Sequence, residues 1–323
     1  MIQEKEKINR IAILLPNKPF FGAMLVQLPL FQHLKSNFPN AKIYGWSPVT
    51  QAKFFKDNGV LDDVIPFGKQ KFKIISQIRK WNPDIIINMR RMSEFSHLVV
   101  SLSGFNTYKV GFETSSPLRV VYNKLQAYQT GNYLAYRYLN LLNAFNISIK
   151  FDFDKIKQLK EKATFTCDKP FICLMPAGGE GEHKRWGIEN FCRTCELISE
   201  RHPEMQFVFI MGSKEEVYLP TIKNTLNEKA LTFINPKIEE IAKIVSDAKV
   251  TISNDCGPGH LAQMCEVNFI SVWGWKGGES PYIRIIEWFF ARPNAHSILP
   301  HDTQKDIKTI PPDNIARLAV QYI

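Results

Sequence analysis

The sequence lacks any apolar stretch long enough for a membrane-spanning helix. None of its apolar runs approaches the roughly 18 residues that such a helix needs. The first seven residues, Met-Ile-Gln-Glu-Lys-Glu-Lys, are too charged for a secretory signal, so we expect none. With 323 residues, 45% of them apolar, the chain is long enough for two soluble globular domains. We therefore expect a cytoplasmic protein.

Cysteine is scarce, and its spacing does not fit a zinc site. There are six cysteines, and one pair, Cys192 and Cys195, has C-x-x-C spacing. That pair lies within an amphipathic helical pattern, and no second Cys or His pair follows at the spacing of a zinc site. This pattern predicts reduced thiols and no metal.

Positive charge is concentrated in the first half of the chain. The net charge is +10, and residues 1–160 hold 23 Lys and Arg against 10 Asp and Glu, whereas residues 161–323 hold 18 against 21. No helix-turn-helix, zinc-finger or RNP pattern accompanies the basic half, so we expect no nucleic-acid partner. An anionic glycolipid or an anionic bilayer fits the charge; a solvated lysine-rich surface is the alternative.

Strand and helix patterns alternate along both halves, which predicts parallel sheets covered on both faces. The predicted strands are 11–15, 42–44, 64–65, 84–88, 109–112, 171–175, 206–211, 232–234, 250–253 and 269–273. Residues 24–38 and the aromatic, leucine-rich stretch 121–145 each predict one helix, and the charged stretch 152–167 predicts the linker between the domains. The expected fold class is α/β, with two Rossmann-like domains, 1–160 and 161–323, facing a cleft.

The most informative segment follows one of these strands. Residues 253–262, Ser-Asn-Asp-Cys-Gly-Pro-Gly-His-Leu-Ala, place an acid, two glycines and a histidine where a helix begins. At a strand end, glycines let the backbone approach a ligand, and the helix offers unpaired N–H groups to phosphate. An ordinary N-cap followed by turn glycines fits this segment alone equally well.

A second segment favours the ligand site. Residues 171–188 run from an apolar strand through a glycine-rich loop to Lys184, Arg185 and Trp186 before a helix. Glycines 178 and 179 would expose backbone donors, and Lys184 supplies a mobile positive charge for a diphosphate. The spacing is not that of a Walker A loop. Together the two segments predict a nucleotide-sugar site.

These segments resemble the glycosyltransferase family that contains the bacterial lipopolysaccharide heptosyltransferases, which have the two-domain GT-B fold. The resemblance spans nearly the whole chain, and residues 176–179, 184–186, 255–260 and 272–274 carry most of it. It implies an inverting transfer of a heptose or related sugar from ADP-heptose or another nucleotide sugar to a lipopolysaccharide core, without metal or other cofactor. Peripheral contact with the cytoplasmic face of the inner membrane is also implied.

The resemblance assigns the donor to the second domain and the acceptor to the first. The donor candidates are Gly178, Gly179, Lys184, Glu215, Glu216, Pro236, Asp255, Cys256, Gly257 and His260. Lys184 corresponds to the lysine that neutralises donor phosphate, and Asp255 to the carboxylate near the donor sugar. For His260, orienting the loop competes with direct contact. The acceptor candidates are Lys18, Gly22, Arg90 and Arg91.

The chain departs from the family at the general base. The family usually has Gly-Asp at the start of the first helix, whereas this chain has Gly22-Ala23, and no Asp or Glu occurs between Lys7 and Lys56. Glu94, His97 and Glu113, near strand ends of the first domain, are the replacement candidates. A degenerate family member that binds nucleotide sugar or glycolipid without turnover is the alternative. A sugar-nucleotide epimerase is less favoured, because we identify no paired catalytic carboxylates.

Overall fold

The computed structural model describes residues 5–68, 72–104, 106–147, 153–179 and 181–323. The chain divides into two compact units, Met1–Asp152 and Phe153–Ile323. The second unit thus begins before the predicted position at residue 161. Phe153 packs edge-on against Phe290, with ring centroids 5.5 Å apart, and the backbone amide of Phe165 donates to Glu240. These contacts attach the residues near the predicted linker to the second unit.

The first unit contains a six-stranded parallel sheet. Its strands, in spatial order, are β3 (Asp63–Pro66), β2 (Lys42–Ser47), β1 (Arg10–Leu14), β4 (Ile85–Asn88), β5 (Tyr108–Phe112) and β6 (Lys124–Gln126). β4 reads Ile-Ile-Ile-Asn and is buried along its whole length, as expected for a strand covered on both faces.

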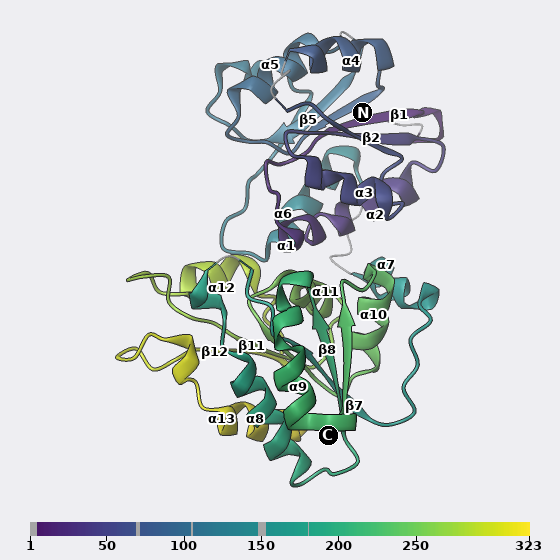
Figure 1. Cartoon of the computed structure of the whole chain (residues 1–323). Coiled ribbons are helices and arrows are strands. Elements are labelled where there is room, and N and C mark those ends of the chain that lie inside the picture. The colour runs from purple at the N-terminus through teal and green to yellow at the C-terminus, as the bar shows by residue number, and fades with distance from the viewer. Residues whose placement is uncertain (1–4, 69–71, 105, 148–152, 180) are drawn as a thin grey trace. The chain divides into compact units, whose positions relative to one another are not determined.

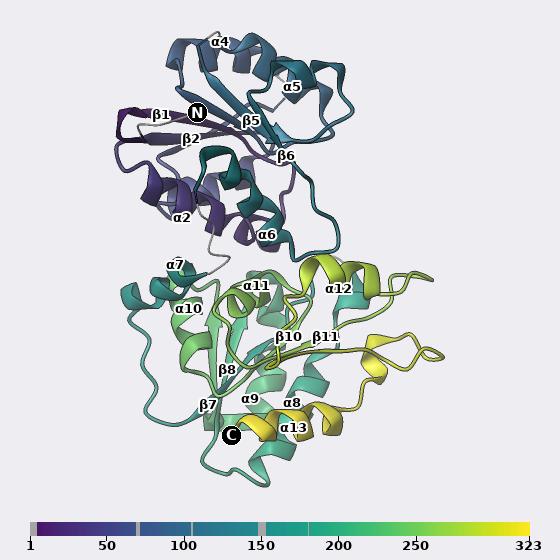
Figure 2. The same cartoon turned by 180° about the vertical axis from the view of Figure 1, so that it is seen from behind.

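Helices cover both faces of this sheet (Figures 1 and 2). They are α1 (Phe21–Leu25), α2 (Leu28–Asn37), α3 (Phe54–Asp57), α4 (Lys73–Trp81), α5 (Glu94–Leu102) and α6 (Leu134–Leu139), with the 3₁₀ helices η1 (Lys5–Lys7), η2 (Thr50–Lys53), η3 (Pro117–Val121) and η4 (Asn140–Phe145). α4 and α5 lie on one face and α2 and α6 on the other. Ile78 and Val99 pack with Trp46 and Ile86 in the core beneath α4 and α5.

Two helical predictions for the first unit are wrong. Residues 24–38 form two helices, α1 and α2, because Pro29 near the start of α2 has no N–H to continue the hydrogen-bond ladder. Residues 121–145 form one helix only at α6; before it, β6 pairs with β5, and Gly131 has φ 83°. The apolar content of this stretch reflects packing of an edge strand and short helices, not one helical face.

The second unit repeats the same topology. Its six parallel strands are, in spatial order, β12 (Ala295–Ile298), β11 (Phe269–Val272), β10 (Thr251–Asn254), β7 (Phe171–Met175), β8 (Gln206–Met211) and β9 (Ala230–Ile234). Numbered within each unit, both sheets have the order 3-2-1-4-5-6 of Rossmann folds. The predicted α/β class with two Rossmann-like domains is confirmed. The edge strands β6 and β12 are short and were not predicted.

The second sheet is also covered on both faces (Figures 1 and 2). Its helices are α7 (Asp154–Lys157), α8 (Ile188–Ser199), α9 (Leu219–Leu226), α10 (Ile238–Asp247), α11 (Gly257–Met264), α12 (Tyr282–Trp288) and α13 (Pro312–Ala319), with the 3₁₀ helices η5 (Gln158–Lys162), η6 (Glu182–Lys184), η7 (Ser213–Tyr218), η8 (Asn227–Lys229), η9 (Ile307–Thr309) and η10 (Val320–Tyr322). Trp186 and Phe191 pack with Ile222 and Ile315 in a core that joins α8, α9 and α13 to the sheet.

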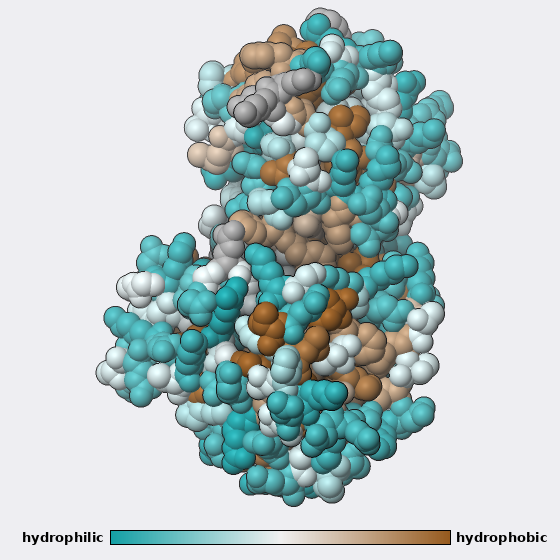
Figure 3. All heavy atoms as spheres, viewed as in Figure 1, coloured by the Kyte–Doolittle hydropathy of each residue, from teal (hydrophilic) through white to brown (hydrophobic). Residues whose placement is uncertain are grey.

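Hydrophilic residues cover most of the face seen in Figure 3, and separate apolar patches appear on both units. Among the described residues, no helix has the length and apolar character needed to cross a membrane. All six cysteines are free, and five of them are buried. Burial raises the pKa of the Cys192 thiol to about 11, which favours the neutral thiol.

Candidate functional site

The two predicted ligand segments meet at one edge of the second sheet. β7 and β10 are adjacent and parallel, and the strand order reverses between them. Residues 176–187 follow the carboxyl end of β7, and residues 255–257 follow that of β10. In open α/β sheets this reversal point is where ligands bind. Two segments separated by about 70 residues in the sequence therefore form a single site.

The side chain of Asn254 joins the two segments. Its amide Nδ2 donates to the carbonyl oxygen of Pro176 at 2.6 Å, and its Oδ1 accepts from the backbone N–H of Trp186 at 3.4 Å. Trp186 is fully buried and donates from Nε1 to the carbonyl of Ile310. These bonds fix the beginning and the end of the glycine-rich loop relative to β10.

Gly178 is required because the loop folds back closely on itself. A Cβ atom added there would lie 2.6 Å from the carbonyl oxygen of Lys184 and 2.4 Å from Cγ of Arg185. Real Cβ atoms do not approach backbone this closely, so any side chain at this position would displace the segment that carries Lys184. Gly179 has φ 55°, a left-handed conformation that glycine adopts without strain.

The charged centre of the site is Asp255 with two cations. Lys184 Nζ lies 2.7 Å from Asp255 Oδ2, and Arg284 Nη1 lies 3.0 Å from the same oxygen. Asp255 is buried, whereas about a quarter of the Lys184 side chain is exposed. Cys256 and Gly257 follow directly, and α11 begins at Gly257. Backbone N–H groups at this helix start add to the positive potential beside the two cations.

His260 lies one turn inside α11 and is buried. The backbone N–H of Phe290 donates to Oε1 of Gln263, which turns the Gln263 amide Nε2 toward His260 Nδ1 at 3.4 Å. Nδ1 therefore accepts, and the ring is neutral. Burial lowers the pKa of His260 from its ordinary value of 6.5 to about 4. These contacts join His260 to Gln263 on the same helix and, through Gln263, to Phe290.

The low pKa of His260 predicts a loss of stability in acid. The folded state binds the proton only below about pH 4, whereas the unfolded chain binds it near 6.5. The free energy of unfolding should therefore fall as the pH is lowered from 6.5 to 4, by about 3 kcal/mol from this group. Denaturant unfolding of His260→Gln should lack this part of the slope. His202→Gln, at a partly exposed surface site, should retain it, and equal slopes in the two variants would refute this role for His260.

The two glutamates after β8 differ in position. Glu215 is buried, and its Oε2 accepts from the backbone N–H of Gly212 at 3.1 Å. Glu216 is exposed. Pro236 is partly buried after β9, and Asn235 beside it donates from Nδ2 to Ser213 Oγ at 2.5 Å. Glu215 and Pro236 thus follow neighbouring strands, β8 and β9, next to β7 at the carboxyl edge of the sheet.

The acceptor candidates of the first unit also follow two adjacent strands. Lys18 and Gly22 follow β1, Arg90 and Arg91 follow β4, and β1 and β4 flank the reversal point of that sheet. Lys18 is exposed, Gly22 is partly buried in α1, and Ala23 next to it is buried, with its carbonyl accepting from Gln27 Nε2 at 2.6 Å.

Both arginines are held in place. The Arg90 guanidinium lies 5.9 Å from the Phe67 ring centroid, and partial burial lowers its pKa. Arg91 Nε donates to the carbonyl of Glu113 at 2.8 Å, and its guanidinium lies 4.9 Å from the Tyr128 ring centroid. Such contacts restrict each arginine side chain before an anion binds, so that less conformational entropy is lost on binding.

A buried polar network supports this turn. Asn88 Nδ2 donates to the Tyr122 hydroxyl at 2.7 Å, and that hydroxyl lies 2.7 Å from His97 Nδ1. The other ring nitrogen of His97, Nε2, lies 2.9 Å from the carbonyl oxygen of Arg91. A carbonyl only accepts, so Nε2 carries the proton and Nδ1 accepts from Tyr122. Both ring nitrogens of buried His97 are thereby occupied.

The other two base candidates are exposed carboxylates. Glu94 begins α5, and its Oε2 accepts from Ser116 Oγ at 2.7 Å. Glu113 follows β5 directly, and its backbone N–H donates to Gln126. β5 pairs with β4, so both glutamates lie at the same sheet edge as Arg90 and Arg91, and both reach solvent.

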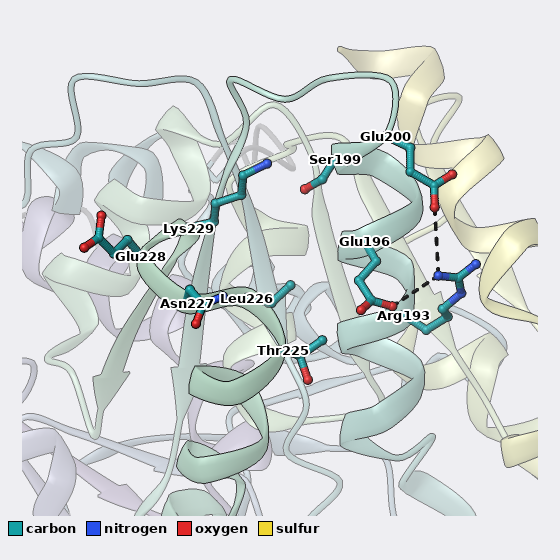
Figure 4. Close-up of a pocket in the computed structure, with 9 residues that line it drawn as sticks. All are labelled: Arg193, Glu196, Ser199, Glu200, Thr225, Leu226, Asn227, Glu228 and Lys229. Atoms are coloured by element: carbon teal, nitrogen blue, oxygen red, sulfur yellow. Dashed lines mark hydrogen bonds and ion pairs between the residues drawn. The ribbon is translucent and has the colours of Figure 1, made fainter.

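A surface groove elsewhere in the second unit has a different character. It has a volume of about 790 Å³ and lies where α8 and α9 end (Figure 4). Arg193 on α8 contacts Glu196 at 3.2 Å and Glu200 at 3.9 Å. The loop of Lys184 precedes the start of α8, whereas this groove lies along the second half of α8 and at its end, away from the Asp255 centre.

Two sheets with Rossmann topology in separate units give this chain a fold of the GT-B type, and a cationic centre lies at the carboxyl edge of the second sheet. The model of glycosyltransferase family 9 (heptosyltransferase) matches residues 72–278. The chain belongs to this family, as the sequence resemblance predicted.

Individual relatives agree with this assignment. The chain is 22% identical over 274 residues to lipooligosaccharide heptosyltransferase 2 of Campylobacter jejuni, covering 82% of this chain and 81% of the relative. It is 26% identical over 227 residues to lipopolysaccharide heptosyltransferase 1 of Campylobacter coli, covering 64% of this chain and 65% of the relative. Its fold is similar to that of E. coli heptosyltransferase WaaC with ADP, with a TM-score of 0.73 at 14% identity over 97% and 100% of the two chains.

Sequence reasoning missed Arg284 and the bridging role of Asn254. Asn254 immediately precedes Asp255 at the end of β10. An amide side chain at this position indicates a residue that hydrogen-bonds to the backbone of the neighbouring loop. Arg284 lies 29 residues beyond Asp255 on a short helix, and no spacing rule connects the two.

Proposed function

We propose that this protein transfers heptose from ADP-heptose to a lipopolysaccharide core acceptor with inversion at the anomeric carbon. The observation that carries the proposal is the pairing of Lys184 with Asp255 at the reversal point of the second sheet, in a chain of the heptosyltransferase family. The choice of ADP is supported by a similar fold solved with ADP-2-deoxy-2-fluoro heptose, at a TM-score of 0.71.

The second unit is proposed to hold the donor. Lys184 neutralises the diphosphate, and Asp255 contacts the sugar and orients the cations. Backbone N–H groups of the Gly178–Gly179 turn and of Cys256 and Gly257 face the phosphates. Glu215 accepts from the ribose hydroxyls, Pro236 borders the base, and His260 supports the loop from behind. Glu216 is exposed on the same turn and is the less favoured ribose contact.

The first unit is proposed to hold an anionic acceptor. Arg90 and Arg91, braced by aromatic rings, bind phosphate or carboxylate groups, and Lys18 and Gly22 contribute from the neighbouring loop. The basic character of residues 1–160 supports both this partner and peripheral contact with an anionic membrane surface. The protein would then act at the cytoplasmic face of the inner membrane.

At the anomeric carbon the reaction forms one bond and breaks one, and a proton is transferred from the acceptor hydroxyl. The acceptor hydroxyl oxygen attacks the anomeric carbon, the bond from that carbon to the phosphate oxygen breaks, and the nucleoside diphosphate leaves with the electron pair. Lys184 and the loop N–H groups stabilise the departing charge. The hydroxyl proton passes to a base.

We propose Glu113 or Glu94 as that base. Both are exposed carboxylates at the acceptor edge of the first sheet, whereas His97 is buried with both ring nitrogens bonded. His97 instead supports the Arg90–Arg91 turn. Ala23 is the observation that favours a second function, binding of nucleotide sugar without turnover, because an alanine cannot accept a proton.

Thermal unfolding with ADP, UDP, GDP and CDP tests the donor assignment. A nucleotide at 100 times its dissociation constant stabilises the folded state by about 2.7 kcal/mol. We expect ADP to raise the unfolding temperature selectively. A selective shift by another nucleotide would move the donor to a different sugar class, and no shift with any of the four would contradict the proposed function. The binding-only alternative would be favoured if ADP raises the unfolding temperature but no sugar transfer is detected. That result would have to hold for wild type as well as for Glu94→Gln and Glu113→Gln.

A further inference from the structure

Helix α12 directs one charged side chain toward the donor centre. Arg284 Nη1 contacts Asp255 Oδ2 at 3.0 Å, Nη2 donates to the carbonyl of Gly274, and the guanidinium carbon lies 5.7 Å from the Trp273 ring centroid. Ile283 and Ile286 on the same helix are 73% and 52% exposed. The helix therefore exposes Ile283 and Ile286 and turns its arginine inward. In Figures 1 and 2, α11 and α12 lie at the same end of the second sheet.

Two cations share one carboxylate oxygen in this centre. Lys184 Nζ and Arg284 Nη1 both contact Oδ2 of Asp255, at 2.7 and 3.0 Å. One carboxylate neutralises only one of them, so the group keeps a net positive charge. The neighbouring His183 responds to this field, since burial, Arg284 and Lys184 all lower its pKa. A partly buried group with surplus positive charge is the arrangement that an anionic ligand completes.

We propose that Arg284 binds the donor diphosphate together with Lys184, and that Asp255 holds the guanidinium in position until the nucleotide arrives. This inference rests on the proposed function, because it takes the anion to be a nucleoside diphosphate. The planar guanidinium suits the exchange: Nη2 stays on Gly274, while Nη1 turns from the carboxylate to a phosphate oxygen. Arg284 is then a phosphate-binding residue from an element that the donor motifs do not include.

A purely structural role for Arg284 predicts different behaviour. In that case its bonds to Gly274 and Asp255 only fasten α12 to the turn after β11, and its loss would weaken every ligand of the site alike. A phosphate-binding role weakens only ligands that carry phosphate. The ratio of affinities for ADP and adenosine within one variant separates these roles, because both ligands sample the same folded fraction.

Isothermal titration of wild type, Arg284→Gln and Arg284→Lys with ADP and pyrophosphate, and competition with adenosine, measures this ratio. Arg193→Gln is the matched control, because Arg193 also pairs with carboxylates in the second unit but lies at the groove where α8 and α9 end. We expect Arg284→Gln to bind ADP and pyrophosphate about 10- to 100-fold more weakly, which is the size of a lost charge-assisted hydrogen bond. Adenosine affinity should change less than twofold, Arg284→Lys should recover part of the loss, and Arg193→Gln should match wild type.

Either of two results for Arg284→Gln would overturn the inference. Unchanged ADP affinity in Arg284→Gln, or an equal loss for ADP and adenosine, would leave the donor site intact and assign Arg284 a structural role. If Arg284→Gln does not fold, the Arg284→Lys variant decides alone. A loss of affinity for ADP without a loss for adenosine would support the inference, and no such selective loss would overturn it. If wild type binds none of ADP, UDP, GDP, CDP or pyrophosphate, the proposed function fails along with the inference.

Discussion

Replacing Lys184 by alanine is expected to lower the rate of sugar transfer by about 10² to 10³, the usual cost of removing one group that stabilises developing negative charge. Lys184 is the mobile cation of the Asp255 centre, and its loop position is fixed by the close approach at Gly178. Its charge acts most strongly when the diphosphate leaves, so kcat should fall more than KM rises. Steady-state kinetics of transfer from the nucleotide sugar measures this.

Two variants control for this effect. Lys184→Arg keeps the charge and should retain more activity than the alanine variant. Lys223→Ala removes an exposed lysine from α9 and should leave the rate unchanged. A Lys184→Ala enzyme whose rate stays within twofold of wild type would contradict the assignment of Lys184 to the leaving diphosphate.

Asp255→Asn is expected to destabilise the ligand-free protein by about 3 kcal/mol, the lower end of the cost of breaking a buried ion pair. Lys184 and Arg284 would face each other without a counter-charge, and their partial exposure moderates the penalty. For a unit of this size the unfolding temperature should fall by about 6 to 12 °C. Bound ADP would restore a negative charge, so the stabilisation by ADP should be larger in the variant than in wild type.

Calorimetry with and without ADP tests both parts of this expectation. Asp302→Asn, an exposed site in the same unit, should behave as wild type. A smaller gain from ADP in Asp255→Asn than in wild type would show that the carboxylate assists nucleotide binding and does not compete for the cations. Sugar transfer by Asp255→Asn should fall even where nucleotide affinity rises, because the variant would lack the contact with the sugar that we propose for Asp255.

The parts of the fold that sequence patterns predicted are those with strong local signals. Five consecutive apolar residues in β7 indicate a strand buried on both faces, and the glycine-rich turn that follows identifies the ligand edge. The family resemblance assigned Lys184 and Asp255 to one donor site, and the structure brings the two side chains together. The prediction of one helix over residues 121–145 was wrong because the aromatic and leucine residues of this stretch belong to an edge strand and two short helices.

Arg284 shows why part of the site was beyond sequence reasoning. A hydrophobic pattern applied to α12 would bury Ile283 and Ile286 and expose Arg284, and the structure does the reverse. The bond to Asp255 and the contact with Trp273 outweigh the local pattern, and both partners lie outside the helix, Asp255 29 residues earlier in the sequence. The base is a related case, since Glu94 and Glu113 carry no motif and only the pairing of β4 with β5 brings them to one edge.

Transfer of heptose by the purified protein tests the central claim most directly. The assay supplies ADP-heptose and a heptose-deficient lipopolysaccharide core, and mass spectrometry follows the acceptor while released ADP is quantified. We predict that the acceptor gains one heptose for each ADP released, with inverted anomeric configuration, and that Lys184→Ala nearly abolishes both signals. Binding of ADP-heptose without any gain in acceptor mass, across a range of core acceptors, would contradict the account and identify a protein that binds the donor without using it.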